Sequence, residues 1–369
     1  MEKRKPVLRE ILSAAVFLVI IGVLFILNIV VPKPTILVAE RRIPAKFPEL
    51  SQKTIFSGSF MSKFDDYAAD NFVLRDTFRG IRAFTVFDLF MQSDKSGLYR
   101  SKDVGYGEFK RSSPDNLRQS AQKVYKAAHS FDGLDMHIYY SLIPDKSIFS
   151  EKYMPGFDLG IAESVLADVL SEFSYIRIAD KLNASYFYKT DLHWDQSRIA
   201  DVAGYILSGM GAVPGAGGYD EDAAGDFYGL YAGQIALPVK PDKLFYENVP
   251  NLQVSYLNEN TLQFEPGPVY DLERFKGVDP YDIFLRGPQP LIVLENTAAT
   301  NGRELYLFRD SFGSSLGPLL AGSYSKVTLI DLRYVNLALL TQFIDFVPGS
   351  DVLFMYGSQI FNNPSVLQT

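Results

Sequence analysis

The pattern of apolar and polar positions separates one long apolar run near the N-terminus from a remainder in which apolar and polar residues are mixed. Residues Ile11 to Val31 form 21 positions without a charge. As a helix rising about 1.5 Å per residue they would extend roughly 30 Å, the thickness of the hydrocarbon core of a bilayer. Pro32 and Pro34 follow, and proline cannot continue a helix. The pattern predicts a transmembrane helix that stops at Pro32.

Basic residues precede this run and predict its orientation. Lys3, Arg4, Lys5 and Arg9 lie before it, and the positive-inside tendency leaves such a leader in the cytoplasm and the bulk of the chain outside. A cleavable signal peptide is the main alternative, but its apolar region is only about 7–15 residues long and ends at small residues. A buried core helix would need no basic leader. We therefore expect an uncleaved signal anchor.

The next segment reads as a linker followed by helix. Residues 33 to about 58 contain three prolines and read as a linker, and Ser59 to Met91 has a helical pattern. The apolar positions form a stripe along this helix, and packing of the stripe in a core is the favoured interpretation. Because the segment lies close to the anchor, a stripe that lies on the lipid surface is the alternative. The stripe consists of Phe60, Phe64, Tyr67, Phe72, Phe78, Phe84, Phe87 and Phe90.

From about residue 97 the pattern alternates between strand and helix. Alternation of this kind predicts a three-layer α/β sandwich with a mainly parallel sheet, because continuous apolar runs are typical of parallel strands buried on both faces. The expected helices are 114–128, 161–173, 197–207 and 337–346, and the expected strands are 136–143, 175–178, 291–294, 305–308, 327–330 and 352–356.

Residues 211–290 differ, because they are rich in glycine and in short β patterns. We interpret them as a turn-rich β insertion whose aromatic side chains either pack a small lobe or stack on sugar rings. The predicted organisation is a leader and anchor (1–32), a linker and amphipathic helical segment (33–96), a first α/β part (97–210), the insertion (211–290) and a second α/β part (291–369).

Two segments together hold the three groups of an acyl-transfer site. Asp191 and His193 lie close together before a predicted helix, and Ser311 follows a predicted strand. A serine hydroxyl needs a base to take its proton, and the base needs an acceptor that fixes its tautomer. Strand-to-helix and loop-to-helix junctions are common places for such groups. The structural alternative is that these three residue types occur together by chance, as they do in most chains of this size.

Other side chains near these segments are candidates for substrate binding. Lys146, Arg309 and Arg333 could neutralise an acidic sugar or an oxyanion, but an ion pair with a neighbouring aspartate explains each equally well. Trp194, the only tryptophan, could be a sugar platform, although burial that anchors the His193 loop is the favoured interpretation. Ser314 and Ser315 are rival nucleophiles that fit a helix cap better.

Charge and composition exclude several classes of function. The net charge is −7, and without residues 1–32 it is −9, so the surface should avoid nucleic acid. The chain has no cysteine, which excludes disulfides and thiolate metal sites. Asp191-x-His193-x-Asp195 is a weak ligand set, and no phosphate-binding or dinucleotide motif is present. We expect neither a metal nor a cofactor.

The chain resembles the DHHW family of bacterial extracytoplasmic proteins, which are relatives of the alginate O-acetylation proteins with an SGNH-hydrolase-like domain. The resemblance covers most of the chain after residue 38. It rests on the order and spacing of segments 40–48, 64–75, 142–146, 191–194, 226–231, 309–312 and 330–334. The family usually has histidine where this chain has Leu192, and often lysine where it has Arg309.

The resemblance implies roles for the candidate residues. Ser311 would be the nucleophile, His193 the general base and Asp191 its orienting carboxylate, with N–H groups after Ser311 binding the oxyanion. The implied function is acetyl transfer to, or deacetylation of, a cell-surface polysaccharide by a protein of the bacterial membrane, with an integral-membrane O-acyltransferase as the partner that delivers acetyl groups. A non-catalytic glycan-binding or scaffold protein, and a peptidoglycan or lipid esterase, are the alternatives.

Overall fold

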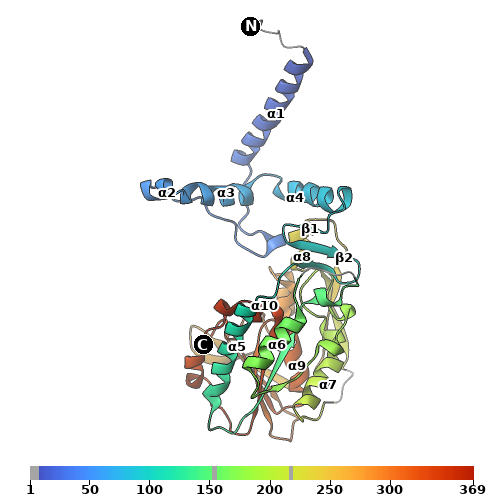
Figure 1. The fold of residues 1–369 in the computed structure, drawn as a ribbon, viewed down its shortest axis with the longest axis vertical. Helices are drawn as coiled ribbons and strands as arrows, with labels where there is room; N and C mark the ends of the chain where they lie inside the picture. Colours follow the sequence, from blue (N-terminus) through green and yellow to red (C-terminus); the bar gives the residue numbers. More distant parts are fainter. Residues whose placement is uncertain (1–7, 152–155, 216–218) are drawn as a thin grey trace. The chain divides into compact units, whose positions relative to one another are not determined.

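The computed structural model describes residues 8–151, 156–215 and 219–369 (Figure 1). Lys3, Arg4 and Lys5 of the predicted basic leader lie outside the described residues. The chain forms two compact units: Met1–Met91 with Gly233–Leu237, and Gln92–Ala232 with Pro238–Thr369. We call them the N-terminal unit and the α/β unit.

The N-terminal unit begins with the apolar helix α1 (Leu8–Val30). It has 23 residues and none of its side chains is buried. By length and composition it is long and apolar enough to cross a membrane. After it come α2 (Gln52–Phe56), α3 (Ser59–Asn71), α4 (Arg75–Phe84) and a π-helical turn, Thr85–Leu89.

The helix expected over Ser59 to Met91 is interrupted at residues 72–74. The Val73 N–H donates to Oδ1 of Asn28 in α1 (3.0 Å) and so is not available to the helical ladder. Leu74 has a left-handed φ of 60° where α4 begins. The expected core packing of the aromatic stripe was also wrong for most of it, because only Phe87 is buried and Phe72, Phe78, Phe84 and Phe90 are exposed.

The α/β unit contains an eight-stranded sheet in the order β5-β4-β13-β11-β12-β10-β8-β9. The first five of these strands pair in parallel, and the last three are joined antiparallel. The strands are β5 (Ser174–Tyr175), β4 (His137–Ile143), β13 (Asp351–Gly357), β11 (Glu304–Arg309), β12 (Lys326–Ile330), β10 (Leu291–Asn296), β8 (Leu252–Asn258) and β9 (Gln263–Gly267).

The sheet is therefore mainly parallel, as expected, with one difference. Residues 291–294 form a strand, but β10 runs antiparallel to β12. An apolar run reports burial on both faces and is silent about direction. Within the segment 211–290, β8 and β9 extend this sheet, while β6 (Glu221–Phe227) and β7 (Asp242–Glu247) form a separate ribbon. The strands β1 (Asp94–Lys95), β2 (Leu98–Ser101) and β3 (Gly105–Glu108) form a third sheet.

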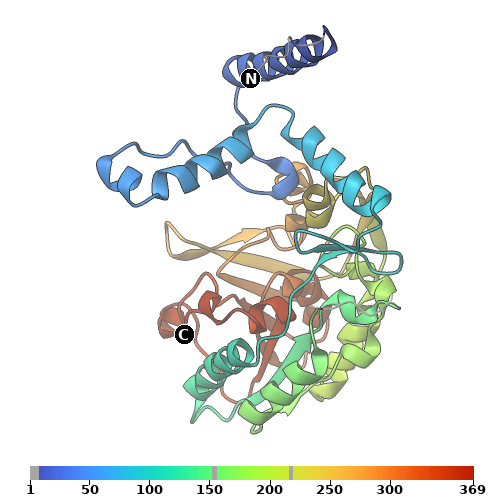
Figure 2. The same ribbon diagram turned by 45° about the horizontal axis from the view of Figure 1, so that its top comes forward.

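Helices cover both faces of the large sheet (Figures 1 and 2). Side chains alternate along a strand, so Leu305 and Leu307 pack in one cluster with α7 (Ala200–Gly209) and α9 (Phe312–Ala321). Tyr306 and Phe308 pack in the other cluster, with α5 (Pro114–Ala128), α6 (Leu159–Val169) and α10 (Ser358–Phe361).

The expected helix over 337–346 is only a 3₁₀ segment, Leu337–Gln342. The Tyr306 hydroxyl accepts from the Val347 N–H (2.9 Å) and donates to the Asp345 carbonyl (3.2 Å), which draws this backbone out of a helical ladder.

Candidate active site

Ser311 lies at the carboxyl end of a parallel strand, where sites form in sheets of this kind. It follows β11 and occupies the residue before α9. Its side chain makes no hydrogen bond that caps α9. The Asp310 carboxylate binds the first N–H of the helix instead: Oδ1 accepts from the Phe312 N–H (3.0 Å), and Oδ2 accepts from the Gly357 N–H (2.6 Å). The serine hydroxyl is therefore left for another partner, and the residue is half-buried.

That partner is His193. Its Nε2 lies 2.7 Å from Ser311 Oγ, and its Nδ1 lies 2.7 Å from Asp191 Oδ1. A carboxylate can only accept, so the proton belongs on Nδ1 and Nε2 accepts from the serine hydroxyl. Asp191 is fully buried and His193 is 5% exposed. The three residues form one continuous hydrogen-bonded chain that ends at the hydroxyl of the half-buried Ser311.

Backbone groups hold the Asp191 carboxylate in place. Oδ1 also accepts from the N–H of His193 (3.1 Å), and Oδ2 accepts from the N–H of Leu230 (2.8 Å), where α8 (Leu230–Ile235) begins. Gly229 sits against this loop: a Cβ there would lie 2.4 Å from Asp191 Cβ and 2.4 Å from the Thr190 carbonyl oxygen. Only glycine lets the two segments approach this closely.

Two aromatic rings fix the plane of the imidazole. Tyr281 stacks on His193 with centroids 3.9 Å apart and an interplanar angle of 8°. Phe312 lies on it at 4.9 Å. The Tyr281 hydroxyl donates to Ser315 Oγ (2.8 Å), and burial raises the pKa of Tyr281 well above its usual value. The Tyr281 ring is therefore neutral and held in place, and its stacking restricts rotation of the His193 imidazole.

Lys146 lies behind the loop that carries Asp191. Its ammonium donates to the carbonyls of Tyr188 (2.8 Å), Asp191 (2.6 Å) and Lys189 (3.3 Å). Burial lowers the pKa of Lys146 to about 8, a shift that nearby carboxylates, among them Asp191, partly oppose. The side chain is 3% exposed, so it supports the backbone around Asp191 and presents no free donor to a substrate.

Trp194 is also fully buried. Its Nε1 donates to Ser315 Oγ (2.8 Å) and its ring meets Phe312 edge-on at 5.2 Å. Between the two alternatives drawn from the sequence, this environment agrees with the loop anchor, because no face of the indole is open for a sugar.

Arg309 and Arg333 both lie near Asp331. Arg309 is fully buried, donates to Ser314 Oγ (2.9 Å) and lies 3.6 Å from Asp331. Burial lowers the pKa of Arg309. Arg333 binds Asp331 through two nitrogens at 2.9 and 2.7 Å. Both side chains are in ion pairs, and their role in substrate binding stays a prediction.

One expectation about the site was wrong. The N–H groups directly after Ser311 do not point to an open oxyanion site, since the Phe312 N–H binds Asp310 Oδ1 and the Gly313 N–H binds the Asp310 carbonyl (3.0 Å). Leu192, which stands where related sequences have histidine, packs against the hydrophobic cluster that contains α7 and α9.

Sequence reasoning missed Tyr281, Asp310 and the Gly229–Leu230 backbone as parts of the site. Gly229 and Leu230 belong to one of the segments that carry the family resemblance, and this was the available signal for them. Tyr281 had none, because it lies outside the segments that carry the resemblance and reaches His193 only through the tertiary fold. No group of three or more histidine, aspartate or glutamate side chains among the described residues is placed to hold a metal ion.

The fold of the chain is similar to that of several solved structures. A DHHW family protein from Eubacterium siraeum matches with a TM-score of 0.56 at 16% identity, over 75% of this chain and 97% of that one. PatB1 of Bacillus cereus, solved with a sulfonyl adduct, matches with a TM-score of 0.57 at 16% identity, over 74% and 98%. These matches include the family that the sequence resembles.

The O-acetyltransferase domain of AlgJ from Pseudomonas putida matches more loosely, with a TM-score of 0.41 at 12% identity over 72% of this chain and 92% of that one. No protein-family model matches the sequence, and no curated protein sequence does either. At these identities the similarity establishes a shared fold.

Proposed function

We propose that this protein is a membrane-anchored, extracytoplasmic SGNH-hydrolase-like enzyme that transfers or removes acetyl groups on a cell-surface polysaccharide. The observation that carries the proposal is the chain Ser311–His193–Asp191, with both contacts at 2.7 Å. A hydroxyl, an imidazole and a buried carboxylate in this order are the groups that nucleophilic acyl transfer needs.

The first half of the reaction acetylates the serine. Ser311 Oγ attacks the carbonyl carbon of an acetyl ester while His193 Nε2 takes the hydroxyl proton. The tetrahedral intermediate collapses as the C–O bond to the leaving alcohol breaks, and His193 returns the proton to that alcohol. Asp191 keeps the imidazole in the required tautomer and stabilises its transient positive charge. We assign the oxyanion to the N–H of Ser311 itself, because the N–H groups of Phe312 and Gly313 are bound to Asp310.

The second half transfers the acetyl group. A sugar hydroxyl loses its proton to His193 Nε2 and attacks the acetyl-serine, and the proton then returns to Ser311 Oγ. Water in the same position gives deacetylation. The choice between the two depends on which acceptor the site holds, and both use the same three residues.

The location and partners follow from α1 and from the sequence resemblance. We infer that α1 is an uncleaved signal anchor with the α/β unit outside the cytoplasm, supported by its apolar length and its basic leader. The proposed partners are a cell-surface polysaccharide and an integral-membrane O-acyltransferase that supplies acetyl groups. A PatB1 structure with a sulfonyl adduct shares this fold, which suggests the reagent for the test.

The test is covalent labelling of the purified full-length chain with a sulfonyl fluoride, followed by peptide mass spectrometry. An activated hydroxyl should displace fluoride, so the adduct is expected on Ser311, and turnover of p-nitrophenyl acetate should stop in proportion. Ser311→Ala should lose both reactions. Ser314→Ala, which removes a hydroxyl three residues further on, should keep them. A folded wild type that neither reacts nor turns over ester would instead favour the non-catalytic glycan-binding or scaffold protein.

A further inference from the structure

The N-terminal unit carries an unusual amount of exposed apolar surface outside α1. Fourteen large apolar residues between residues 43 and 91 are exposed, against ten in the described part of 92–369. A soluble surface rarely keeps so dense a patch without a partner. The residues are Ile43, Phe47, Leu50, Ile55, Phe56, Met61, Phe72, Leu74, Phe78, Ile81, Phe84, Leu89, Phe90 and Met91.

Three of these residues lie on one face of α4, counting Leu74, the residue that precedes it. Leu74, Phe78 and Ile81 follow each other at spacings of four and three, and they are 53%, 45% and 56% exposed. Arg75 and Arg79 lie on another side of the helix and face inward. Arg75 pairs with Glu40 (2.6 Å) and Arg79 donates to the carbonyls of residues 233 and 234 (3.1 and 3.0 Å). The helix thus packs through its charged side and leaves its apolar side uncovered, the reverse of a soluble helix.

The end of α1 is tied to the corner between α3 and α4. Asn28 accepts from the Val73 N–H (3.0 Å), and the Lys33 ammonium bridges the carbonyls of Asn28 (2.7 Å) and Asn71 (3.0 Å). Leu8 to Asn28 covers 20 residue steps of helix, or roughly 30 Å, which is the hydrocarbon thickness of a bilayer. With α1 spanning, the corner lies at the level of the lipid headgroups.

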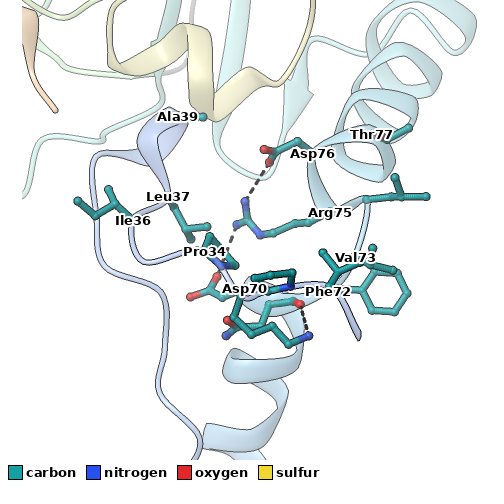
Figure 3. A pocket seen from close by; sticks show the side chains of 15 residues that line it. Pro34, Ile36, Leu37, Ala39, Asp70, Phe72, Val73, Arg75, Asp76 and Thr77 are labelled. Carbon is teal, nitrogen blue, oxygen red and sulfur yellow. Dashed lines mark hydrogen bonds and ion pairs between the residues drawn. The ribbon is translucent and has the colours of Figure 1, made fainter. Parts of the chain in front are cut away.

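The apolar surface is continuous from α1 onto this corner. A notch of about 460 Å³ is lined by Leu24 and Phe25 of α1 together with Phe64, Tyr67 and Phe72. The neighbouring pocket in Figure 3, of about 600 Å³, is more polar: Asp70, Arg75 and Asp76 line it and are held in ion pairs. Lys33 lines both pockets, and its ammonium is taken up by the carbonyls of Asn28 and Asn71. The surface that α1 would offer to lipid therefore extends along α3 and α4.

The charge of the segment fits the same partner. Residues 33–91 carry nine basic and seven acidic side chains, a net +2, whereas residues 92–369 carry 23 and 34, a net −11. Net positive charge beside an apolar face is typical of helices that lie in the interface of a membrane with anionic lipid.

We propose that the helices α2 to α4 and the turn that follows form a lipid-contact surface, the apolar face of which is inserted in the interface of the bilayer that α1 crosses. The proposal rests on the membrane anchor of the proposed function and is independent of the acetyl chemistry. The protein would then be held in the membrane by the spanning helix α1 and by a monotopic surface next to the C-terminal end of that helix.

Because the chain has no cysteine, single cysteines can report the depth of individual positions. Phe78→Cys and Phe84→Cys sample the apolar face, Asp76→Cys is exposed on another side of α4, Phe17→Cys lies in α1, and Leu262→Cys is exposed in the α/β unit. Each full-length variant is labelled with bimane and reconstituted in phosphatidylcholine–phosphatidylglycerol vesicles containing lipids with a nitroxide either near the headgroup or near the chain end.

The labels at Phe78 and Phe84 should lose emission to the nitroxide near the headgroup, and the label at Phe17 to the one near the chain end, while Asp76 and Leu262 stay bright. Quenching at Phe17 without quenching at Phe78 and Phe84 would overturn the lipid-contact surface and leave the anchor intact. Labels at Phe78 and Phe84 that are shielded from aqueous iodide and untouched by either nitroxide would mean that protein covers the face, which also refutes the proposal. An unquenched Phe17 would refute both the anchor and the surface.

Discussion

Replacing Gly229 by alanine should separate Asp191 from His193 without altering either side chain. The new Cβ would lie 2.4 Å from Asp191 Cβ and 2.4 Å from the Thr190 carbonyl oxygen, where ordinary contacts begin near 3.4 Å. The loop must therefore move by about 1 Å. It has little freedom to do so, because the N–H of Leu230 and the ammonium of Lys146 both hold it.

The size of the effect follows from this displacement. A misplacement of about 1 Å can cost about 10²-fold in rate when the groups must be aligned for reaction. Overpacking a filled interior costs typically about 1–3 kcal/mol of unfolding free energy. We therefore expect Gly229→Ala to lower the turnover of p-nitrophenyl acetate by about two orders of magnitude while the α/β unit still folds.

The assay compares kcat and urea unfolding followed by the fluorescence of Trp194, the single tryptophan. Gly267→Ala, on the edge strand β9, is the matched control. Its new Cβ would lie 2.7 Å from the Tyr256 ring, so the substitution creates a similar clash without involving Asp191. Gly204→Ala, with no atom within 4 Å of the new Cβ, controls for the substitution itself. Full activity in Gly229→Ala, or an equal loss in Gly267→Ala, would refute the reasoning.

Three further predictions concern the same site and the anchor. The folded pKa of Lys146 is about 8 and the unfolded value about 10.4, so between these pH values the unfolded state binds the extra proton. The unfolding free energy of the wild type should therefore rise over that window by about 3 kcal/mol relative to Lys146→Met, measured by urea titration; parallel pH curves would contradict the burial of its charge. Asp191→Asn should retain more ester turnover than His193→Ala, because the carboxylate only orients the base, and the reverse order in kcat would exclude the proposed roles. Protease added to spheroplasts should digest the α/β unit, and a unit protected until the membrane is dissolved would reverse the assigned topology.

Local sequence was sufficient for the elements whose patterns reflect burial. The helix Pro114–Ala128 was placed at its bounds because one of its faces is apolar, and the structure shows that Ser113 caps it by accepting from the Asn116 N–H. The strands β11, β12 and β13 were placed from their apolar runs. These signals are local, since capping and burial depend on neighbouring residues and on their spacing.

The direction of β10 and the exposure of the aromatic stripe could not be read in this way. An apolar run looks the same in a parallel and an antiparallel central strand, and an amphipathic helix looks the same whether its apolar face meets a core or a membrane. In α4 the inward side was decided by Glu40 and by the carbonyls of residues 233 and 234, which are distant in sequence.

For the site, the sequence by itself determined the reactive groups: Ser311 after a strand, and His193 two residues beyond Asp191. Only the tertiary structure decided what surrounds them, from the Tyr281 ring on His193 to the Leu230 N–H on Asp191 and the Lys146 ammonium on the loop carbonyls. The physical reason is that chemical identity belongs to a residue, whereas orientation, burial and pKa come from groups that the fold brings together from separate parts of the chain.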